Sequence, residues 1–253
     1  MIARPGSLTL RFLGKSWAVL ALLAFWQLWV STTDLNSIVV VSPLSVARDI
    51  VLHAPVYLVP AVWTTAFALT GLALGMIAGL VLAIACWYSR MLSGLLQPAA
   101  LLLTATPVVC LIPLLARLFG YQGRTELITV TVMTFFPSFV YAGSGLTRLP
   151  PRSAELFQTL HASRVRRLLL LALPAAVPSL AVALRVGTAY SILVTVVAEF
   201  IMQTGGLGDM FAVTMQQFNL HRAFGASIIA MALSTALYEA STAFELRIRR
   251  IFT

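Results

Sequence analysis

Long apolar stretches alternate with short polar segments along this chain of 253 residues. The apolar runs cover residues 17–30, 63–88, 92–119, 125–146, 175–202 and 225–244. Such runs predict transmembrane helices, because about 20 apolar residues in a helix cross the hydrocarbon core of a bilayer. We therefore predict an all-α integral membrane protein with six transmembrane helices, and we expect residues 1–253 to form a single transmembrane domain.

Composition supports this fold class. The chain is 60% hydrophobic and only 10% charged, whereas soluble domains carry roughly 25% charged residues. The formal net charge of +9 would suit a nucleic-acid partner, but the cations flank apolar spans instead of forming one basic patch. A nucleic-acid-binding function is therefore excluded. The two cysteines, Cys86 and Cys110, lie in apolar surroundings and predict neither a disulfide framework nor a metal site.

The distribution of basic residues orients the six predicted spans. With both termini inside the cell, the inner segments hold twelve Lys and Arg residues and the outer segments hold four, with Arg185 left out. Positive charge accumulates on the cytoplasmic side of membrane proteins. We therefore expect residues 1–16 to be a cytoplasmic segment before an uncleaved first span, and residues 148–173 to be a cytoplasmic loop between the fourth and fifth spans.

This loop predicts two short helices. Pro150 and Pro151 form a rigid start, after which Ser153 is expected to cap a helix that runs to about His161. Glu155 lies in its first turn, where the helix dipole favours an acid. Ser163 is expected to cap a second helix that begins with Arg164. A short polar helix between two spans is suited to docking a cytoplasmic partner.

Small residues and prolines mark special positions within and between the spans. Gly71, Gly75 and Gly79 recur every fourth residue, so they share one helical face on which another helix can pack closely. The third predicted span is interrupted by three prolines, which kink membrane helices.

Outside the membrane, Ser42 is expected to start an amphipathic surface helix with solvated charges. The glycine-rich turn at residues 204–209 is expected to form a re-entrant loop over the outer mouth.

A few polar residues fall inside the predicted spans. Intramembrane charges usually face a bundle interior or a water-filled cavity. Arg185 is expected either to line a translocation pathway or to pair with a backbone carbonyl or an acid, and Glu199 is expected near the outer interface as a structural partner. Thr134 and Thr188 are further candidates for lining a pathway, although such hydroxyls more often bond back to their own helix.

Catalytic chemistry is missing from the sequence. No paired carboxylates, no Ser/His/Asp arrangement and no His/Cys cluster occur at a working spacing. His53, His161 and His221 fall on different loops and on different predicted sides of the membrane. No span carries the chain of acids and histidines that proton-coupled pumps use. We expect no metal and no cofactor in this chain, and we expect a separate partner to supply the energy for transport.

The loop resembles a family motif. Residues 154–180 resemble the cytoplasmic loop of permease subunits of binding-protein-dependent ABC importers, in which E-A-A, three residues and G are followed by I-x-L-P. Glu155 matches the acid, and Ala172, Leu173 and Pro174 match the ending. Further features resemble the nitrate/sulfonate/taurine branch of these permeases: Ser42-Pro43, Phe135-Phe136-Pro137, Pro178, Ala198-Glu199 and Gly205–Gly208.

This resemblance implies a function. It implies the type I importer permease fold in a bacterial inner membrane, with the loop helix as a coupling helix that binds a cytoplasmic ATPase. By resemblance, the partners are two ATPase subunits, which hold ATP and Mg²⁺, a second permease subunit and an extracytoplasmic binding protein. The solute expected is small and anionic, such as a sulfonate, taurine or nitrate, and an aromatic acid or a pyrimidine precursor stays open because the binding protein makes the main selection in this family. The coupling residues carried over are Ser153, Ala154, Glu155, Leu156, Phe157, Thr159, Leu160, His161, Ser163 and Arg164.

The chain departs from the motif at two places. Leu156 and Phe157 replace the two alanines, and His161 replaces the loop glycine. These changes predict a differently shaped ATPase contact, or a second, better-matching permease subunit that completes the pore. The alternative function is an autonomous secondary transporter or channel, for which we find no clear internal repeat. A membrane enzyme is disfavoured because the chain lacks a polar catalytic constellation.

Overall fold

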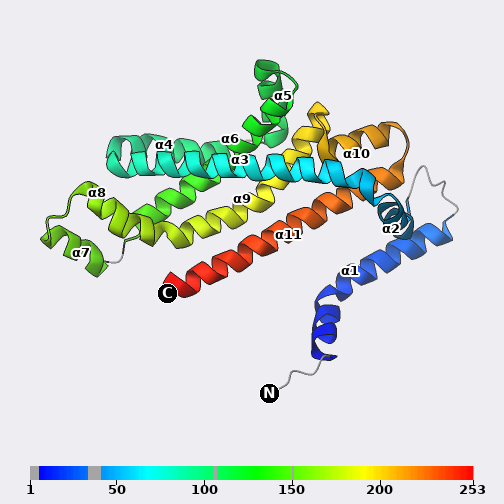
Figure 1. Ribbon diagram of the computed structural model, residues 1–253, viewed down its shortest axis with the longest axis horizontal. Coiled ribbons are helices and arrows are strands. Elements are labelled where there is room, and N and C mark those ends of the chain that lie inside the picture. The colour runs from blue at the N-terminus through cyan, green and yellow to red at the C-terminus, as the bar shows by residue number, and fades with distance from the viewer. Residues whose placement is uncertain (1–5, 34–40, 105–106, 150, 253) are drawn as a thin grey trace.

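The computed structural model describes residues 6–33, 41–104, 107–149 and 151–252, in which helices and connecting turns are the only structure (Figure 1). This confirms the all-α prediction. The helices are α1 (Gly6–Thr32), α2 (Pro43–Leu52), α3 (Ala54–Tyr88), α4 (Arg90–Thr104), α5 (Val108–Phe119), α6 (Gly123–Thr147), α7 (Pro151–Thr159), α8 (Arg164–Arg167), the π-helical turn η1 (Leu168–Ala172), α9 (Leu173–Met202), α10 (Gly206–Gln216) and α11 (Leu220–Phe252).

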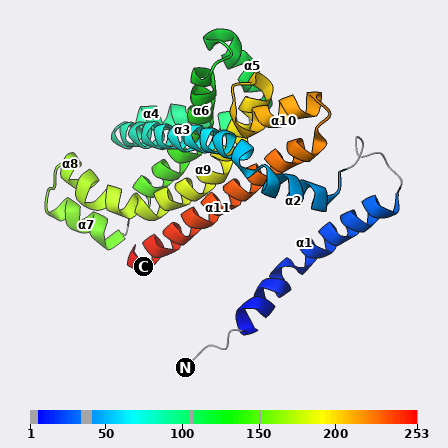
Figure 2. The same cartoon turned by 45° about the vertical axis from the view of Figure 1, so that its right-hand side comes forward.

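Four long apolar helices form the body of the molecule. Helices α3, α6 and α11, together with the continuous segment Arg164–Met202 that contains α9, are each long and apolar enough to cross a membrane. Two views of the chain agree that α7 and α8 lie at one end of this body while α2 and α10 lie at the other (Figures 1 and 2). The two ends therefore present different elements on opposite sides of the bundle.

The first and third predicted spans differ from a single uniform helix. Among the described residues, their shorter apolar helices cover Ala21–Thr32 and Val108–Phe119. The third span is divided into α4 and α5, and Pro107 is the N-cap of α5. Pro98 and Pro113 instead lie inside these two helices. Thus only one of the three prolines marks the break, and the other two are accommodated within helical turns.

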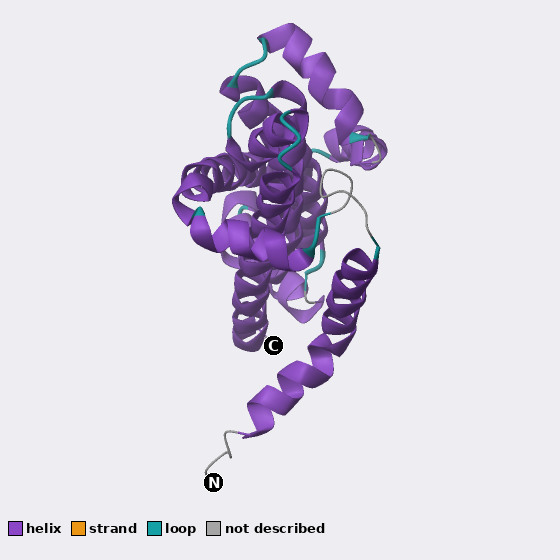
Figure 3. Ribbon diagram, turned by 90° about the vertical axis from the view of Figure 1, so that its right-hand side faces the viewer, coloured by secondary structure: helices purple, strands orange, loops and turns teal. Residues whose placement is uncertain are grey.

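Helix α1 stands apart from the other long helices (Figure 3). Its carboxyl-terminal end contacts the bundle, where the Gln27 side chain accepts a hydrogen bond from the Leu44 amide at 3.2 Å. The rings of Trp26 and Phe224 lie 6.2 Å apart. Residues 1–5, and with them Arg4 of the predicted cytoplasmic segment, lie outside the described residues.

The closest packing in the bundle joins α3 to α6. Gly71, Gly75 and Gly79 are all buried, and a Cβ atom on any of them would overlap atoms of α6. On the other side of α6, a Cβ atom on Gly145 would lie 2.9 Å from the Ala176 Cα atom of α9. Small residues therefore let α6 approach both neighbouring helices, and the three glycines on α3 face a partner helix as the sequence pattern predicts.

Helix α2 is held more firmly than a solvated surface helix. Ser42 caps it as predicted, since its hydroxyl accepts a hydrogen bond from the Ser45 amide. The prediction that the α2 charges are solvated is wrong for Asp49. This carboxylate accepts a hydrogen bond from the Tyr57 hydroxyl at 2.5 Å and lies 3.7 Å from the Arg222 guanidinium. Asp49 therefore ties α2 to α3 and α11.

Candidate docking and translocation surfaces

The loop between α6 and α9 forms a short helix, a tight turn and a second helix. Helix α7 begins at Pro151 and ends at Thr159. The prediction that Ser153 caps this helix is wrong, because Ser153 lies within its first turn. Proline suits the start of a helix, where its missing N–H is not needed. The second predicted cap is confirmed, since the Ser163 hydroxyl accepts a hydrogen bond from the Arg166 amide at 3.4 Å.

The turn after α7 has the geometry of a glycine-terminated helix. His161 has φ +48°, the left-handed region that glycine adopts at least cost. The Ala162 amide donates to the Phe157 carbonyl at 3.2 Å, which is the long hydrogen bond of a Schellman helix ending. The imidazole Nδ1 lies 3.0 Å from the Thr159 carbonyl. Histidine thus takes the backbone conformation of the family glycine, which the sequence alone left open.

The docking segment, residues 151–164, exposes a mixed surface. Glu155 and His161 are exposed polar side chains, while Leu156 is 54% and Leu160 is 67% exposed. Phe157 is half-buried. Among the other expected coupling residues, Thr159, Ser163 and Arg164 are exposed, Ser153 is half-buried, and Ala154 belongs to α7. Exposed leucines beside charged groups are what a protein partner buries at an interface.

Arg185 forms an ion pair inside the bundle. Its Nε atom lies 3.0 Å from Glu245 Oε2 on α11, and its guanidinium carbon lies 6.0 Å from the centre of the Tyr238 ring. The other Glu245 oxygen accepts a hydrogen bond from Arg249 Nε at 2.8 Å. The Glu245 side chain is only 4% exposed. The sequence left open whether Arg185 lines a pathway or pairs with another group. The structure shows that Arg185 pairs with an acid, Glu245.

The two threonine candidates bond back to the backbone. The Thr188 hydroxyl donates to the Leu184 carbonyl at 2.6 Å, and the Thr134 hydroxyl donates to the Val130 carbonyl at 2.8 Å. Both side chains are buried. In this conformation their hydroxyl protons are used within the protein, as hydroxyls in helices commonly are.

Glu199 is fully buried near the carboxyl-terminal end of α9. The Thr64 hydroxyl of α3 lies 2.8 and 2.9 Å from its two carboxylate oxygens. The Gly208 amide donates to the same carboxylate at 2.9 Å, and the Leu207 amide donates to the Thr64 hydroxyl at 2.9 Å. Buried carboxylates need such partners. Glu199 therefore joins α3, α9 and the start of α10.

A second buried acid lies at the same end of the bundle. Glu126 on α6 has no exposed surface, and one of its oxygens accepts a hydrogen bond from the Thr204 hydroxyl at 2.8 Å. Thr204 precedes the turn in which Gly205 and Gly206 have φ +102° and +83°. The predicted re-entrant turn is thus fixed to the bundle by two buried glutamates, and it leads directly into α10.

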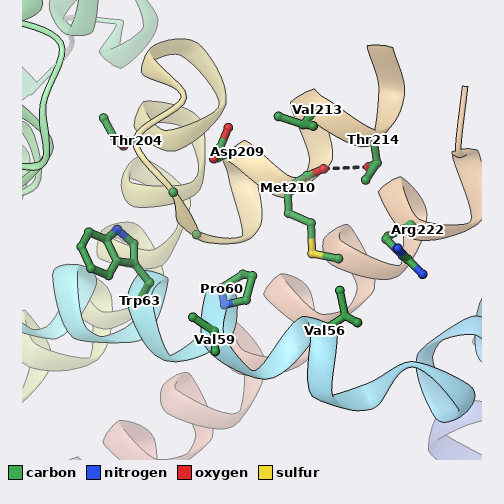
Figure 4. A pocket seen from close by; sticks show the side chains of 12 residues that line it. Val56, Val59, Pro60, Trp63, Thr204, Asp209, Met210, Val213, Thr214 and Arg222 are labelled. Carbon is green, nitrogen blue, oxygen red and sulfur yellow. Dashed lines mark hydrogen bonds between the residues drawn. The ribbon is translucent and has the colours of Figure 1, made fainter. Parts of the chain in front are cut away.

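An open cavity of about 480 Å³ lies beside this turn. Figure 4 shows Trp63 and Pro60 of α3 on one side and Met210 and Asp209 of α10 opposite them. Arg222 of α11 lies at the edge of the cavity, and most of the lining is apolar. A space of this kind, apolar with a few charged groups, suits a small solute.

Sequence reasoning missed three residues of these sites. Thr64 and Glu245 each bind a partner on another helix, and Glu126 binds Thr204 in the turn before α10. The role of Glu245 was predictable from the sequence, because an acid near the end of the last span is a suitable partner for the intramembrane Arg185. The role of Thr64 was not predictable, because its partner lies 135 residues away in the sequence. Among the described residues, no group of His, Cys, Asp and Glu side chains is arranged to hold a metal ion.

Comparison with known proteins places the chain in a family. Residues 71–250 match the binding-protein-dependent transport system inner membrane component. The chain is 29% identical to a probable ABC transporter permease protein of Haemophilus influenzae, over 86% of this chain and 89% of the relative. It is 30% identical to the taurine transport system permease protein TauC of Escherichia coli, over 52% of this chain and 48% of the relative.

Other similarities reach different solutes and a solved structure. The chain is 27% identical to the formylaminopyrimidine transport permease protein ThiX of Halalkalibacterium halodurans, over 62% of each protein. A chain of the inward-facing MetNI methionine ABC transporter has the same fold, with a TM-score of 0.64 at 16% identity, and the match covers 76% of this chain and 95% of that one. The protein therefore belongs to the family of binding-protein-dependent ABC transporter permeases, multi-pass inner membrane proteins whose ATPase is a separate subunit.

Proposed function

We propose that α7 is the helix on which the partner ATPase docks, and that this end of the bundle faces the cytoplasm. The observation that carries the proposal is the exposed surface of α7 at one end of the long helices, with Glu155, Leu156 and Leu160 available to a partner. The basic start of α8 and the Arg-rich end of α11 lie at the same end, in agreement with the positive-inside rule.

This orientation supports six membrane crossings with both termini in the cytoplasm. The four long helices supply four crossings. Helix α1 supplies one, and α4 and α5 together supply another. Residues 1–253 then form a single transmembrane permease domain with the type I importer fold, in which residues 148–173 are the cytoplasmic coupling loop.

The assembly that follows has two permease subunits, two ATPase subunits and an extracytoplasmic binding protein. Because His161 keeps the left-handed turn that the motif requires, the altered residues Leu156 and Phe157 change the side chains of the docking helix more than its shape. A pore of two identical subunits and a pore completed by a second permease both accommodate this loop. Purification of the complex with one permease species alone would exclude the second arrangement.

Reversal of one exposed charge tests the docking helix. Glu155→Lys should leave the protein in the membrane but weaken copurification of the ATPase and lower ATP-driven uptake. The matched control is Arg250→Glu, which reverses an exposed charge at the end of α11. Unchanged copurification and uptake in Glu155→Lys would contradict the proposal. Uptake driven by an ion gradient in vesicles that lack the ATPase would instead support the autonomous transporter.

For the solute, we propose a small anion of the sulfonate type. Three of the relatives carry aliphatic sulfonate or taurine names, and Arg185 is an intramembrane cation on α9 that is partly exposed despite its pairing with Glu245. We retain Arg185 as a pathway candidate. Thr188 is buried and donates its hydroxyl within α9. Thr134 and Glu199 bond across helices and are better suited to holding them together.

The outer cavity favours a second candidate, a planar heteroaromatic solute. Trp63 lines this cavity beside apolar side chains, and an aromatic ring of a solute stacks favourably on an indole. The relatives ThiX and RibX are named for transport of formylaminopyrimidine and riboflavin.

A binding assay on the cognate extracytoplasmic protein distinguishes the two solute classes. Calorimetric titration with ethanesulfonate, taurine and a substituted pyrimidine should give saturable binding of a sulfonate. Uptake of the same compounds into proteoliposomes with the complete transporter should follow the same order. Binding and uptake of the pyrimidine alone would replace the sulfonate proposal with the heteroaromatic one.

A further inference from the structure

A polar cavity of about 450 Å³ lies at the end of the bundle that carries the docking helix. Helix α6 and its C-cap Arg148 form one side, α9 forms a second and the end of α11 forms the third. Two arginines and three hydroxyl groups line this inner arginine cavity, and its other lining residues are apolar. The polar lining consists of Arg148, Arg249, Tyr141, Ser144 and Ser179.

Arginines cluster around the cavity. Arg249 shares Glu245 with Arg185, because the two arginines approach different oxygens of the same carboxylate at 2.8 and 3.0 Å. Among the described residues, Arg148 is in no ion pair. Arg148 therefore adds a cation to a junction of three helices at which two other arginines share one carboxylate. Arg148 and Arg249 are both exposed, so an anion that reaches this end of the bundle can contact their guanidinium groups.

The neutral groups in the cavity suit the same ligand. Within the described part of the chain, no hydrogen bond occupies the side-chain hydroxyls of Tyr141, Ser144 and Ser179. Hydroxyl groups donate to oxyanions, and a guanidinium binds sulfonate and phosphate groups through parallel N–H donors. The volume is in the range of sites for small ligands. Cation, hydroxyl donors and space therefore converge on one chemical class.

We propose that the inner arginine cavity binds a sulfonate or phosphate oxyanion between Arg148 and Arg249. The inference rests on the proposed function for the side of the membrane that the cavity faces. The oxyanion is supplied by the solute that leaves the pathway or by the headgroup of an anionic phospholipid. Bound there, it links α6, α9 and α11.

The position of Arg148 gives this site a regulatory consequence. Arg148 is the C-cap of α6, and α7 begins at Pro151. An anion that fixes Arg148 to Arg249 therefore restrains the attachment of the docking helix. Accumulated solute or anionic lipid on the cytoplasmic side should thus change the rate at which the ATPase turns over, without any contact with nucleotide.

The test uses the complete transporter with its ATPase in lipid nanodiscs. In nanodiscs of phosphatidylcholine alone, ethanesulfonate and inorganic phosphate should raise the melting temperature of the wild type in a saturable manner. Arg148→Gln should weaken this apparent affinity by about tenfold, since it removes a charge-assisted contact. Arg148→Lys should restore part of it. Arg90→Gln, which removes an exposed arginine at the start of α4, is the control and should leave the affinity unchanged.

A second set of nanodiscs with phosphatidylglycerol identifies the source of the oxyanion. If a lipid headgroup occupies the site, the melting temperature without added anion should be higher than in phosphatidylcholine, and ethanesulfonate should not raise it further. The same response as in phosphatidylcholine assigns it to a soluble anion. The absence of any effect in both sets, or equal effects in the wild type and Arg148→Gln, would overturn the proposal.

Failure of this site is distinguishable from failure of the proposed function. Glu155→Lys should lose ATPase copurification but keep the anion-dependent melting shift of the permease. If instead ethanesulfonate shifts the melting temperature but is not transported, the solute assignment fails while the anion site stands. Arg249→Gln serves as a second variant, although it also removes a partner of Glu245, so Arg148→Gln remains the primary test.

Discussion

The Thr64 hydroxyl lies between both carboxylate oxygens of Glu199, at 2.8 and 2.9 Å, and at the same time accepts a hydrogen bond from the Leu207 amide. All three groups are buried. One side chain thus connects α3 with α9 and with the first turn of α10. Because α10 lies at the end of the bundle opposite α7 and α8 (Figure 1), this contact fixes α10 to the long helices at that end.

Replacement of Thr64 tests this outer contact. Thr64→Val keeps the shape of the side chain but leaves a buried carboxylate oxygen and a buried amide without their partner. An unsatisfied buried group costs about 1–3 kcal/mol, so the melting temperature of the purified protein should fall clearly. Thr65→Val is the matched control, because the Thr65 hydroxyl bonds only to the Ala61 carbonyl of its own helix. Equal melting temperatures for the two variants would contradict the assignment.

The packing of α3 on α6 is tested at Gly75. A Cβ atom there would overlap the Thr134 side chain and lie 2.7 Å from the Thr131 carbonyl oxygen. Gly75→Ala should therefore separate the two helices and destabilise the protein by about 1–3 kcal/mol, as overpacking does. Gly94→Ala on α4 is the control, since no atom lies within 4 Å of its added Cβ. Helix propensity favours alanine there. The difference in melting temperature measures the effect, and a Gly75→Ala variant as stable as Gly94→Ala would refute tight packing.

The turn after the docking helix gives a prediction of opposite sign. His161 has φ +48°, a conformation that costs a residue with a side chain roughly 1–2 kcal/mol. His161→Gly should relieve this strain, and a net gain of about 0.5–1 kcal/mol should remain after the larger unfolded-state entropy of glycine. Hydrogen exchange of the amides in residues 152–163 should slow accordingly. Thr159→Gly, inside α7, should speed exchange instead; slowing in both variants would show that backbone strain is not the cause.

The sequence predicted elements better than contacts, for a physical reason. Apolar length and basic flanks fix where helices cross a membrane, and capping hydroxyls such as Ser42 and Ser163 act on amides three residues away. Such local effects are readable from the chain. The partner of Thr64 depends instead on how three helices are rotated in the fold. Hydrophobic periodicity identifies which face of a helix is buried, but it does not identify the residue of another helix that contacts that face. The roles of Glu126 and Thr64 were therefore not predicted from the sequence.

Proline positions show the same limit. Pro107 breaks the third predicted span, whereas Pro98 and Pro113 lie inside helices. Each proline removes one N–H donor and crowds the preceding turn. Whether the helix then kinks or ends depends on neighbouring groups that can satisfy the released carbonyls. The sequence identifies all three candidates equally, and only the packing around them selects one.

The ion pair between Arg185 and Glu245 separates a structural role from a pathway role. If the pair mainly holds α9 to α11, Glu245→Gln leaves Arg185 without its acidic partner, and Arg185→Gln leaves Glu245 bound to Arg249 alone. Each single change should then lower the melting temperature. The double variant should then be less destabilised than the sum of both, with a coupling energy of about 0.5–3 kcal/mol. If Arg185 also contacts an anionic solute, Arg185→Gln lowers uptake more than Glu245→Gln does at equal stability. Melting temperature and uptake measured on all four proteins resolve the two roles, because a purely structural pair affects both quantities in proportion. An additive cycle with normal uptake in Arg185→Gln would exclude both.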